Sequence, residues 1–253
     1  MKNPFQDIAY DNSIDLQLIE AILDGSKSSL ETLVLRHQHY IYNIAMKMML
    51  SPSDAEDLTQ EILIKVITKL AQFKGKSNFR TWLYRIATNH LLKAKESGLE
   101  KYIASFETYG RQLDHIKDHS LSAEETIEKK ELIKEAKLSC LSGMLLCLNR
   151  SQRMVYILGE IFEADHNIGS ELLDISKANF RKRLERARKD LYQFMNQKCG
   201  LINRDNPCRC AKKTTGFIKA GWVDKEKMRY NAHYLKSIHD VLHDKSQQLD
   251  DLI

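Results

Sequence analysis

Apolar residues recur at steps of three and four in three consecutive stretches near the start of the chain, the spacing of one face of an α-helix. The first stretch begins at residues 28–31, which have the capping-box spacing Ser-x-x-Glu, and ends near Ser51. Ser51 and Pro52 supply a cap and a first-turn proline for the second stretch. A polar turn at residues 74–78 precedes the third, which covers about residues 79–95. Short connections predict a compact bundle of antiparallel helices.

The periodicity fades between residues 97 and 121 and returns after a second capping-box spacing at residues 122–125. Further along, the pattern predicts a helix, a short helix, a tight turn at residues 174–176 and a long final helix. Asp174 tolerates the left-handed backbone that such a turn requires, and Ser176 is a favourable N-cap. This order of elements predicts a helix-turn-helix.

The whole chain is therefore expected to be all-α, with two small helical domains joined by a linker and followed by a cysteine-containing extension. Its 253 residues include only three prolines and ten glycines, and alternating β-branched stretches are hard to find. An amphipathic pattern through Leu235, Ile238 and Leu242 predicts one more helix near the end. The expected boundaries are residues 15–96 for the helical bundle, 97–121 for the linker, 122–197 for the helix-turn-helix domain and 198–253 for the extension.

Charge and hydropathy limit the expected partners and the expected location of the protein. The formal net charge of +5 mildly favours an anionic partner such as nucleic acid. No apolar run approaches the roughly 18 residues needed to cross a bilayer, and the first residues do not resemble a signal peptide, so we expect a cytoplasmic protein without membrane insertion. In a reduced compartment, five unevenly spaced cysteines favour thiols or metal ligands over a disulfide framework.

The final helix of the helix-turn-helix carries a dense basic face. Such a helix is suited to a major groove, where basic side chains reach phosphates and base edges. The alternative is a solvated basic face, which the turn and the preceding helices disfavour. The residues expected to contact DNA are Lys177, Asn179, Arg181, Lys182, Arg183, Arg186 and Arg188.

Two motifs in the N-terminal half carry a family resemblance: DAEDLTQE at residues 54–61 and FRTWLYRIATN at residues 79–89. Together with residues 148–191, they resemble the extracytoplasmic-function (ECF) sigma factors of bacterial RNA polymerase. The resemblance covers about residues 15–95 and 125–195. It implies a sigma region 2-like domain that binds core polymerase and recognises and melts the −10 element. It also implies a sigma region 4-like domain that binds the −35 element.

The resemblance also assigns residue roles. An acidic face would grip the clamp helices of the largest polymerase subunit through Asp54, Asp57, Gln60 and Glu61. The alternative for this face is an ordinary solvated surface. Promoter opening would use the loop at residues 74–78 to capture a flipped base and aromatic side chains to stack on others. The residues implied for this role are Lys76, Ser77, Asn78, Phe79, Arg80, Trp82, Arg85, Asn89 and Lys93. Phe79 and Trp82 have the alternative of being core residues.

Two departures from the family pattern concern DNA recognition. Residues 90–96 are only weakly basic where the family has an arginine cluster, and Gly169 stands where a large aliphatic residue is expected. Both favour softer DNA recognition and suggest the hypothesis of an accessory DNA-targeting protein. The other expected partners are core RNA polymerase, through its clamp helices and flap, promoter DNA and an anti-sigma factor.

No cofactor is required for such a role, but the extension contains a candidate zinc site. Its thiols are those of Cys199, Cys208 and Cys210, with a histidine of the extension (His233, His239 or His243) or an outside group as fourth ligand. Free thiols and a redox switch are the alternatives. Cys140 and Cys147 are expected to be core residues.

Three rival functions remain. A helix-turn-helix regulator that acts without binding core polymerase explains the final helices but leaves the motifs at residues 54–61 and 79–89 without a role. An enzyme is disfavoured because the sequence has no phosphate-binding G-x-x-x-x-G-K, no H-E-x-x-H and no convincing nucleophile motif. A structural adaptor would bind polymerase but not DNA. A sigma factor that directs transcription initiation is the favoured hypothesis.

Overall fold

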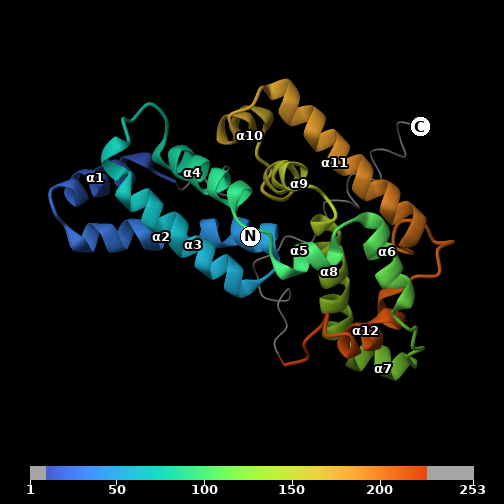
Figure 1. Ribbon diagram of the computed structural model, residues 1–253. Coiled ribbons are helices and arrows are strands. Elements are labelled where there is room, and N and C mark those ends of the chain that lie inside the picture. Colours follow the sequence, from blue (N-terminus) through green and yellow to red (C-terminus); the bar gives the residue numbers. More distant parts are fainter. Residues whose placement is uncertain (1–9, 227–253) are drawn as a thin grey trace. The chain divides into compact units, whose positions relative to one another are not determined.

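The computed structural model describes residues 10–226, and the regular elements in that range are all helical (Figure 1). The only strand-like pairing in that range is an isolated backbone bridge between Cys199 and Cys208. The expected all-α fold class is therefore confirmed. Within the same residues, no helix combines the length and the apolar character that a bilayer crossing requires. The helix predicted through Leu235, Ile238 and Leu242 lies outside the described residues.

The described residues form two compact units. The N-terminal unit comprises residues 10–99 and 154–184, and the C-terminal unit comprises residues 100–153 and 185–226. The predicted domain boundaries, which separate residues 15–96 from residues 122–197, stay a prediction.

The N-terminal unit contains four helices of the first 99 residues and the elements from 157 onwards. The former are α1 (Asn12–Leu23), α2 (Lys27–Met49), α3 (Pro52–Thr68) and α4 (Phe79–Lys93), with a short 3-10 turn, η1 (Leu70–Gln72). The latter are a π-helical turn, η2 (Ile157–Ile161), α10 (His166–Leu173) and the first part of α11 (Lys177–Lys198).

Local signals explain where α2 and α3 begin. Ser51 caps α3 by accepting a hydrogen bond from the amide of Asp54 at 3.4 Å, and Pro52 opens the helix, as predicted. The start of α2 differs from the prediction. Its N-cap is Ser26, whose hydroxyl accepts from the amide of Ser29 at 3.3 Å, and Ser28 is already helical. The hydroxyl of Ser26, two residues before the predicted cap Ser28, therefore caps the helix.

A buried carboxylate holds α1 and α2 together. The side chain of Asp15 is fully buried and accepts hydrogen bonds from Tyr10 at 2.7 Å and from Arg36 at 2.9 Å, and its other contact is with His37 at 2.9 Å. Burial opposes the charged form, but these hydrogen bonds outweigh it and hold the pKa of Asp15 below its usual value. Two helices and the residue that precedes α1 by two positions therefore meet at one carboxylate.

The same region fixes the start of α4. The N-cap residue Asn78 makes no side-chain capping bond. Instead, the side-chain oxygen of Asn12 accepts from the amide of Phe79 at 2.9 Å, and the hydroxyl of Tyr10 accepts from the amide of Arg80 at 3.4 Å. Residues from the start of α1 thus satisfy amides that a helix leaves unpaired at its N-terminus.

The helix-turn-helix has the predicted turn. Asp174 adopts a left-handed conformation with φ 53° and ψ 46°, and Ser176 caps α11 by accepting from the amide of Asn179 at 3.2 Å. The interpretation of Gly169 needs correction. A Cβ at this position would overlap the ring of Phe180, a buried residue of α11. The glycine therefore allows close packing of α10 on α11 and does not weaken it.

The C-terminal unit begins in the predicted linker. Residues 97–121 contain α5 (Gly98–Ile103) and α6 (Phe106–His115). This stretch is thus not a structureless connection, because Tyr109 of α6 is buried and donates to the carbonyl of Cys140 at 2.8 Å. Its role as a linker between functional domains stays a prediction.

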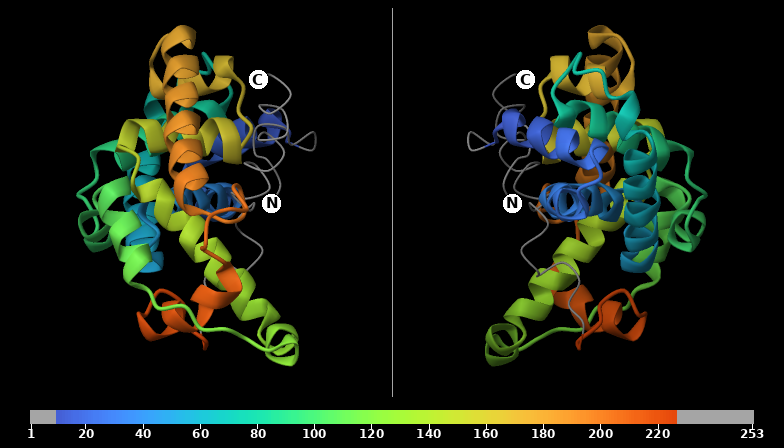
Figure 2. Two further views of the ribbon diagram at one scale, coloured as in Figure 1. Left: turned by 90° about the vertical axis from the view of Figure 1, so that its right-hand side faces the viewer. Right: turned by 90° about the vertical axis from the view of Figure 1, so that its left-hand side faces the viewer.

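The remaining helices of the C-terminal unit are α7 (Ala123–Glu128), α8 (Lys130–Leu146), the start of α9 (Arg150–Tyr156), the second part of α11 and α12 (Cys210–Lys219). Of the helices in this unit, α6, α7 and α12 pack against α8. The predicted capping box opens α7: Ser122 and Glu125 exchange hydrogen bonds of 2.9 and 3.1 Å. Buried Glu100 forms ion pairs with Arg150 at 2.6 Å and Arg153 at 2.7 Å. In Figure 2, α12 lies beside α8.

The packing at Gly169 predicts an unusual response to substitution. Gly169→Ala should lower the free energy of unfolding by about 1–3 kcal/mol, because the new Cβ overpacks against Phe180. Thermal or urea unfolding measures the change. Gly98→Ala is the matched control, since nothing lies within 4 Å of its added Cβ. Without overpacking, a change from glycine to alanine within a helix would stabilise the protein, because alanine is intrinsically about 1 kcal/mol more favourable than glycine there. A Gly169→Ala protein more stable than wild type would contradict this packing.

Candidate protein and nucleic-acid interfaces

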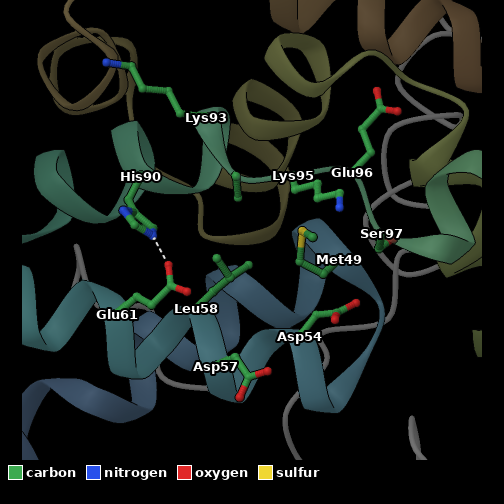
Figure 3. A pocket seen from close by; sticks show the side chains of 11 residues that line it. Met49, Asp54, Asp57, Leu58, Glu61, His90, Lys93, Lys95, Glu96 and Ser97 are labelled. Carbon is green, nitrogen blue, oxygen red and sulfur yellow. Dashed lines mark hydrogen bonds and ion pairs between the residues drawn. The ribbon is translucent and has the colours of Figure 1, made fainter.

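The acidic face of α3 lines a groove in the N-terminal unit. The buried stripe of this helix is Ala55, Leu58, Ile62 and Val66, which turns the carboxylates outwards. Asp54, Asp57 and Glu61 of α3 line a pocket of about 430 Å³, and Figure 3 shows Glu61 directed across it towards His90. The structure thus brings together three of the four residues predicted to bind polymerase. Gln60 is exposed on the same helix but does not line the pocket.

The opposite wall of the groove comes from the end of α4 and the residues after it. His90 faces Glu61, with 2.8 Å between its Nε2 and a carboxylate oxygen (Figure 3). Lys93 and Lys95 also line the pocket. From the sequence, residues 90–96 are only weakly basic, and the contact by which His90 joins the two helices was not predicted. Its place directly after the RIATN motif, 29 residues beyond Glu61, was the available signal. The groove therefore offers three carboxylates on the α3 wall, whereas the other wall carries His90, Lys93 and Lys95 together with Glu96.

The loop at residues 74–78 is accessible. Lys74, Gly75, Lys76 and Asn78 are exposed, and Ser77 is half-buried. Gly75 has φ +65°, a conformation that side chains rarely adopt, so a glycine suits this turn. Because Asn12 caps α4, the side chain of Asn78 is not required for capping. The loop therefore presents short polar side chains beside two lysines.

Two residues predicted to contact DNA are buried instead. Phe79 is fully buried and makes ring contacts with Phe73 at 5.4 Å and Trp82 at 5.6 Å. Arg80 is 8% exposed, with its guanidinium 3.5 Å from the ring centre of Tyr10. These positions argue against direct DNA contact and fit the core role left open for Phe79. The cause is local: the first turn of α4 points into the α1–α2 network. Trp82 is half-buried, so the residue remains partly accessible although its ring contacts Phe73 and Phe79.

The outer face of α4 keeps the other predicted residues accessible. Arg85 and Lys93 are exposed and Asn89 is half-buried. Arg85 forms an ion pair with Asp174 of the helix-turn-helix at 3.1 Å, with both side chains substantially exposed. On the neighbouring buried side, the hydroxyl of Thr88 donates to the carbonyl of Leu172 at 3.1 Å. α10 thus packs on the second half of α4, and a DNA contact by Arg85 would require its pair with Asp174 to open.

The predicted basic face of α11 is accessible. Lys177, Asn179, Arg181, Lys182 and Arg186 are exposed, and Arg183 and Arg188 are half-buried. Phe180, Leu184, Ala187 and Leu191 form the buried stripe of the helix, as predicted. The helix therefore has the composition that binding in a major groove requires.

The predicted zinc ligands lie in the C-terminal unit. Cys199 and Cys208 are paired by the isolated bridge, and Cys210 begins α12. Burial raises the pKa of the Cys210 thiol to about 12, and the thiols of Cys199 and Cys208 contribute to the rise. Within residues 10–226, no three His, Cys, Asp or Glu side chains form a ready set of metal ligands. The three candidate fourth ligands, His233, His239 and His243, lie outside the described residues.

Sequence comparisons find similarity to known proteins over part of the N-terminal unit. The model of sigma-70 region 2 matches residues 33–97, which include the α3 face and α4. RNA polymerase sigma-H factor of Pseudomonas aeruginosa is 41% identical over 75 residues, 30% of this chain and 39% of the relative. The ECF RNA polymerase sigma-E factor of Escherichia coli K12 is 39% identical over 75 residues, with the same coverage. The alignments thus span less than half of these relatives.

One solved structure, of CnrH in complex with the cytosolic domain of CnrY, matches with a TM-score of 0.48 and 17% sequence identity. The match covers 74% of this chain and 97% of the matched chain. Residues 33–97 therefore match sigma-70 region 2, and over 75 residues this chain is similar to sigma factors of bacterial RNA polymerase.

Proposed function

We propose that this protein is a sigma factor, which binds core RNA polymerase and directs promoter recognition, promoter opening and transcription initiation. The observation that carries the proposal is the acidic face of α3 within the matched sigma-70 region 2 domain. Sigma factors are initiation factors and not enzymes, so the proposal includes no catalytic residue. It requires no cofactor, and it assigns the chain to the cytoplasm, where transcription takes place.

Core polymerase would bind at the groove between α3 and the end of α4. Carboxylates complement a basic helical surface such as the polymerase clamp, and electrostatic complementarity selects the partner and its orientation. The Glu61–His90 contact holds one carboxylate in place at 2.8 Å, while Asp57 remains exposed. We expect the clamp helices to engage this groove and the flap to engage the helix-turn-helix domain.

Promoter DNA would be divided between two surfaces. The basic face of α11 would read the −35 element, because closed duplex offers phosphates and base edges to a helix in the groove. The loop at residues 74–78, with Trp82, Asn89 and Lys93, would act on the −10 element during opening. Base stacking on an aromatic ring is worth about 1–3 kcal/mol per base. Half-buried Trp82 is the aromatic side chain of α4 suited to this role.

The finer partner assignments belong to the same proposal. An anti-sigma factor or an accessory DNA-targeting protein would regulate where and when the factor acts. The weakly basic residues 90–96 support the accessory protein, whereas Gly169 no longer does, because it fits the packing of Phe180. A regulator that binds DNA without core polymerase is the alternative, and the turn between α10 and α11 suits either function.

Charge reversal on α3 tests the polymerase interface. Asp57→Lys with Glu61→Lys should weaken core polymerase binding at least about 100-fold, because like charges would face a basic partner. Fluorescence anisotropy of labelled protein with purified core polymerase measures the affinity, and circular dichroism checks helicity. Glu20→Lys with Glu31→Lys, two exposed positions on α1 and α2, is the control of equal charge change. Unchanged affinity in the α3 variant would refute the interface.

Alanine substitution on α11 tests promoter reading. Replacing Arg181, Lys182, Arg183 and Arg186 should abolish preference for the −35 element. Each lost phosphate contact should flatten the salt dependence of DNA affinity by about one unit of slope. Binding to duplex DNA across salt concentrations measures both effects. The control replaces four exposed lysines elsewhere: Lys27, Lys69, Lys130 and Lys134. If the α11 variant still selects the promoter, another element is the reader.

Alanine substitutions at two asparagines distinguish an effect on promoter opening from an effect on folding. Asn78→Ala should leave thermal stability near wild type, because Asn12 caps α4, yet reduce permanganate-reactive thymines in the promoter bubble. Asn12→Ala should instead destabilise the protein by about 0.5–2 kcal/mol through loss of the cap. Thermal unfolding and permanganate footprinting measure the two effects. Normal promoter melting by Asn78→Ala would remove this residue from base capture.

A further inference from the structure

Three cysteines of the extension are gathered by backbone structure. Cys199 follows the last residue of α11, and its backbone pairs with that of Cys208 in the isolated parallel bridge. The amide of Gly200 donates to the carbonyl of Cys208 at 3.2 Å, and a Cβ on Gly200 would overlap that carbonyl. Cys210 lies two residues beyond Cys208, as the first residue of α12. The loop between residues 200 and 207 therefore brings Cys208 back beside Cys199.

A fourth cysteine joins them from α8. α12 packs along α8, which carries Cys140 (Figures 1 and 2). Two hydrogen bonds fix this neighbourhood: Tyr109 donates to the carbonyl of Cys140 at 2.8 Å, and Ser139 donates to the carbonyl of Trp222 at 3.0 Å. Burial raises the pKa of Cys140 well above its usual value, and the thiols of Cys210, Cys199 and Cys208 raise it further. The expectation that Cys140 is simply a core residue thus misses its neighbours.

The accessibility of the thiols disfavours a redox switch. Redox-sensing cysteines are accessible and favour the thiolate form. Cys140, Cys199, Cys208 and Cys210 are each partly buried. A divalent cation suits such a site, because it stabilises several neighbouring thiolates at once.

We propose that Cys140, Cys199, Cys208 and Cys210 bind one Zn²⁺ ion in a tetrahedral four-thiolate site. Four zinc–sulfur bonds form, four thiol protons pass to the solvent, and no oxidation or reduction takes place. The side chains of residues 10–226 do not already converge on one point, so binding requires rotation of thiols about their Cα–Cβ bonds. A closed four-cysteine set is typical of structural zinc. The ion would fasten the end of α11 and the start of α12 to α8.

The test uses the full chain alone, purified under reducing conditions, so its result is independent of polymerase binding. Elemental analysis should find about one zinc per chain, and zinc added to metal-free protein should release about four protons. Co²⁺ should produce the absorption bands of a tetrahedral thiolate site. Cys140→Ser should weaken zinc affinity by more than about 100-fold, since even the loss of a group supporting a ligand costs 10–100-fold.

Cys147→Ser is the matched control. Cys147 is the C-cap residue of α8, and its thiol donates to the carbonyl of Gly143 at 3.9 Å. This variant should bind zinc as wild type does. If Cys140→Ser fails to fold, alkylation of the wild-type protein replaces it: zinc should protect Cys140 but leave the rate at Cys147 unchanged. The proposal is overturned if no zinc binds, if Cys140→Ser binds zinc like wild type, or if zinc leaves Cys140 unprotected.

Discussion

The N-terminal unit depends on one buried charge, the carboxylate of Asp15. A buried carboxylate is costly unless donors surround it, and the loss of one partner from such a site is strongly destabilising. Tyr10 and Arg36 donate to it, and His37 completes the set at 2.9 Å. Tyr10 in turn accepts from the backbone of α4 and lies against the guanidinium of Arg80. One carboxylate thus fixes α1, α2 and the start of α4.

This anchoring determines which groups are accessible. The first turn of α4 is committed to the interior, so Phe79 and Arg80 contribute to stability rather than to the surface. The residues just before and beyond it remain available: Asn78 in the loop, and Arg85, Asn89 and Lys93 along the helix. α3 buries its apolar stripe and presents carboxylates at the groove. The α3 groove and the outer face of α4 are therefore neighbouring accessible surfaces, and Lys93 belongs to both.

Local sequence signals predicted much of the fold. The cap at Ser51, the capping box at Ser122 and the left-handed turn at Asp174 depend on residues within three positions of each other. Contacts between distant segments were not predictable in this way. Nothing near Gly169 indicates that the ring of Phe180 fills its space, and nothing near Cys140 indicates that α12, which begins with Cys210, packs on its helix.

The candidate site shows the same contrast between what local motifs predict and what depends on contacts between distant segments. The motif at residues 54–61 located the acidic groove, because the spacing of its carboxylates along one helix determines a face. The role of His90 required knowledge of how α4 lies against α3. The Arg85–Asp174 pair likewise joins residues 89 positions apart, through the packing of α10 on α4. Sequence motifs therefore identify surfaces, while tertiary packing determines which side chains of a motif reach them.

The central claim is that this chain confers promoter specificity on core RNA polymerase. In vitro transcription with purified core polymerase over a promoter library, with start sites mapped, tests it most directly. The account predicts initiation at a defined set of promoters only when the chain is added. DNA binding by the chain without any chain-dependent initiation would contradict it.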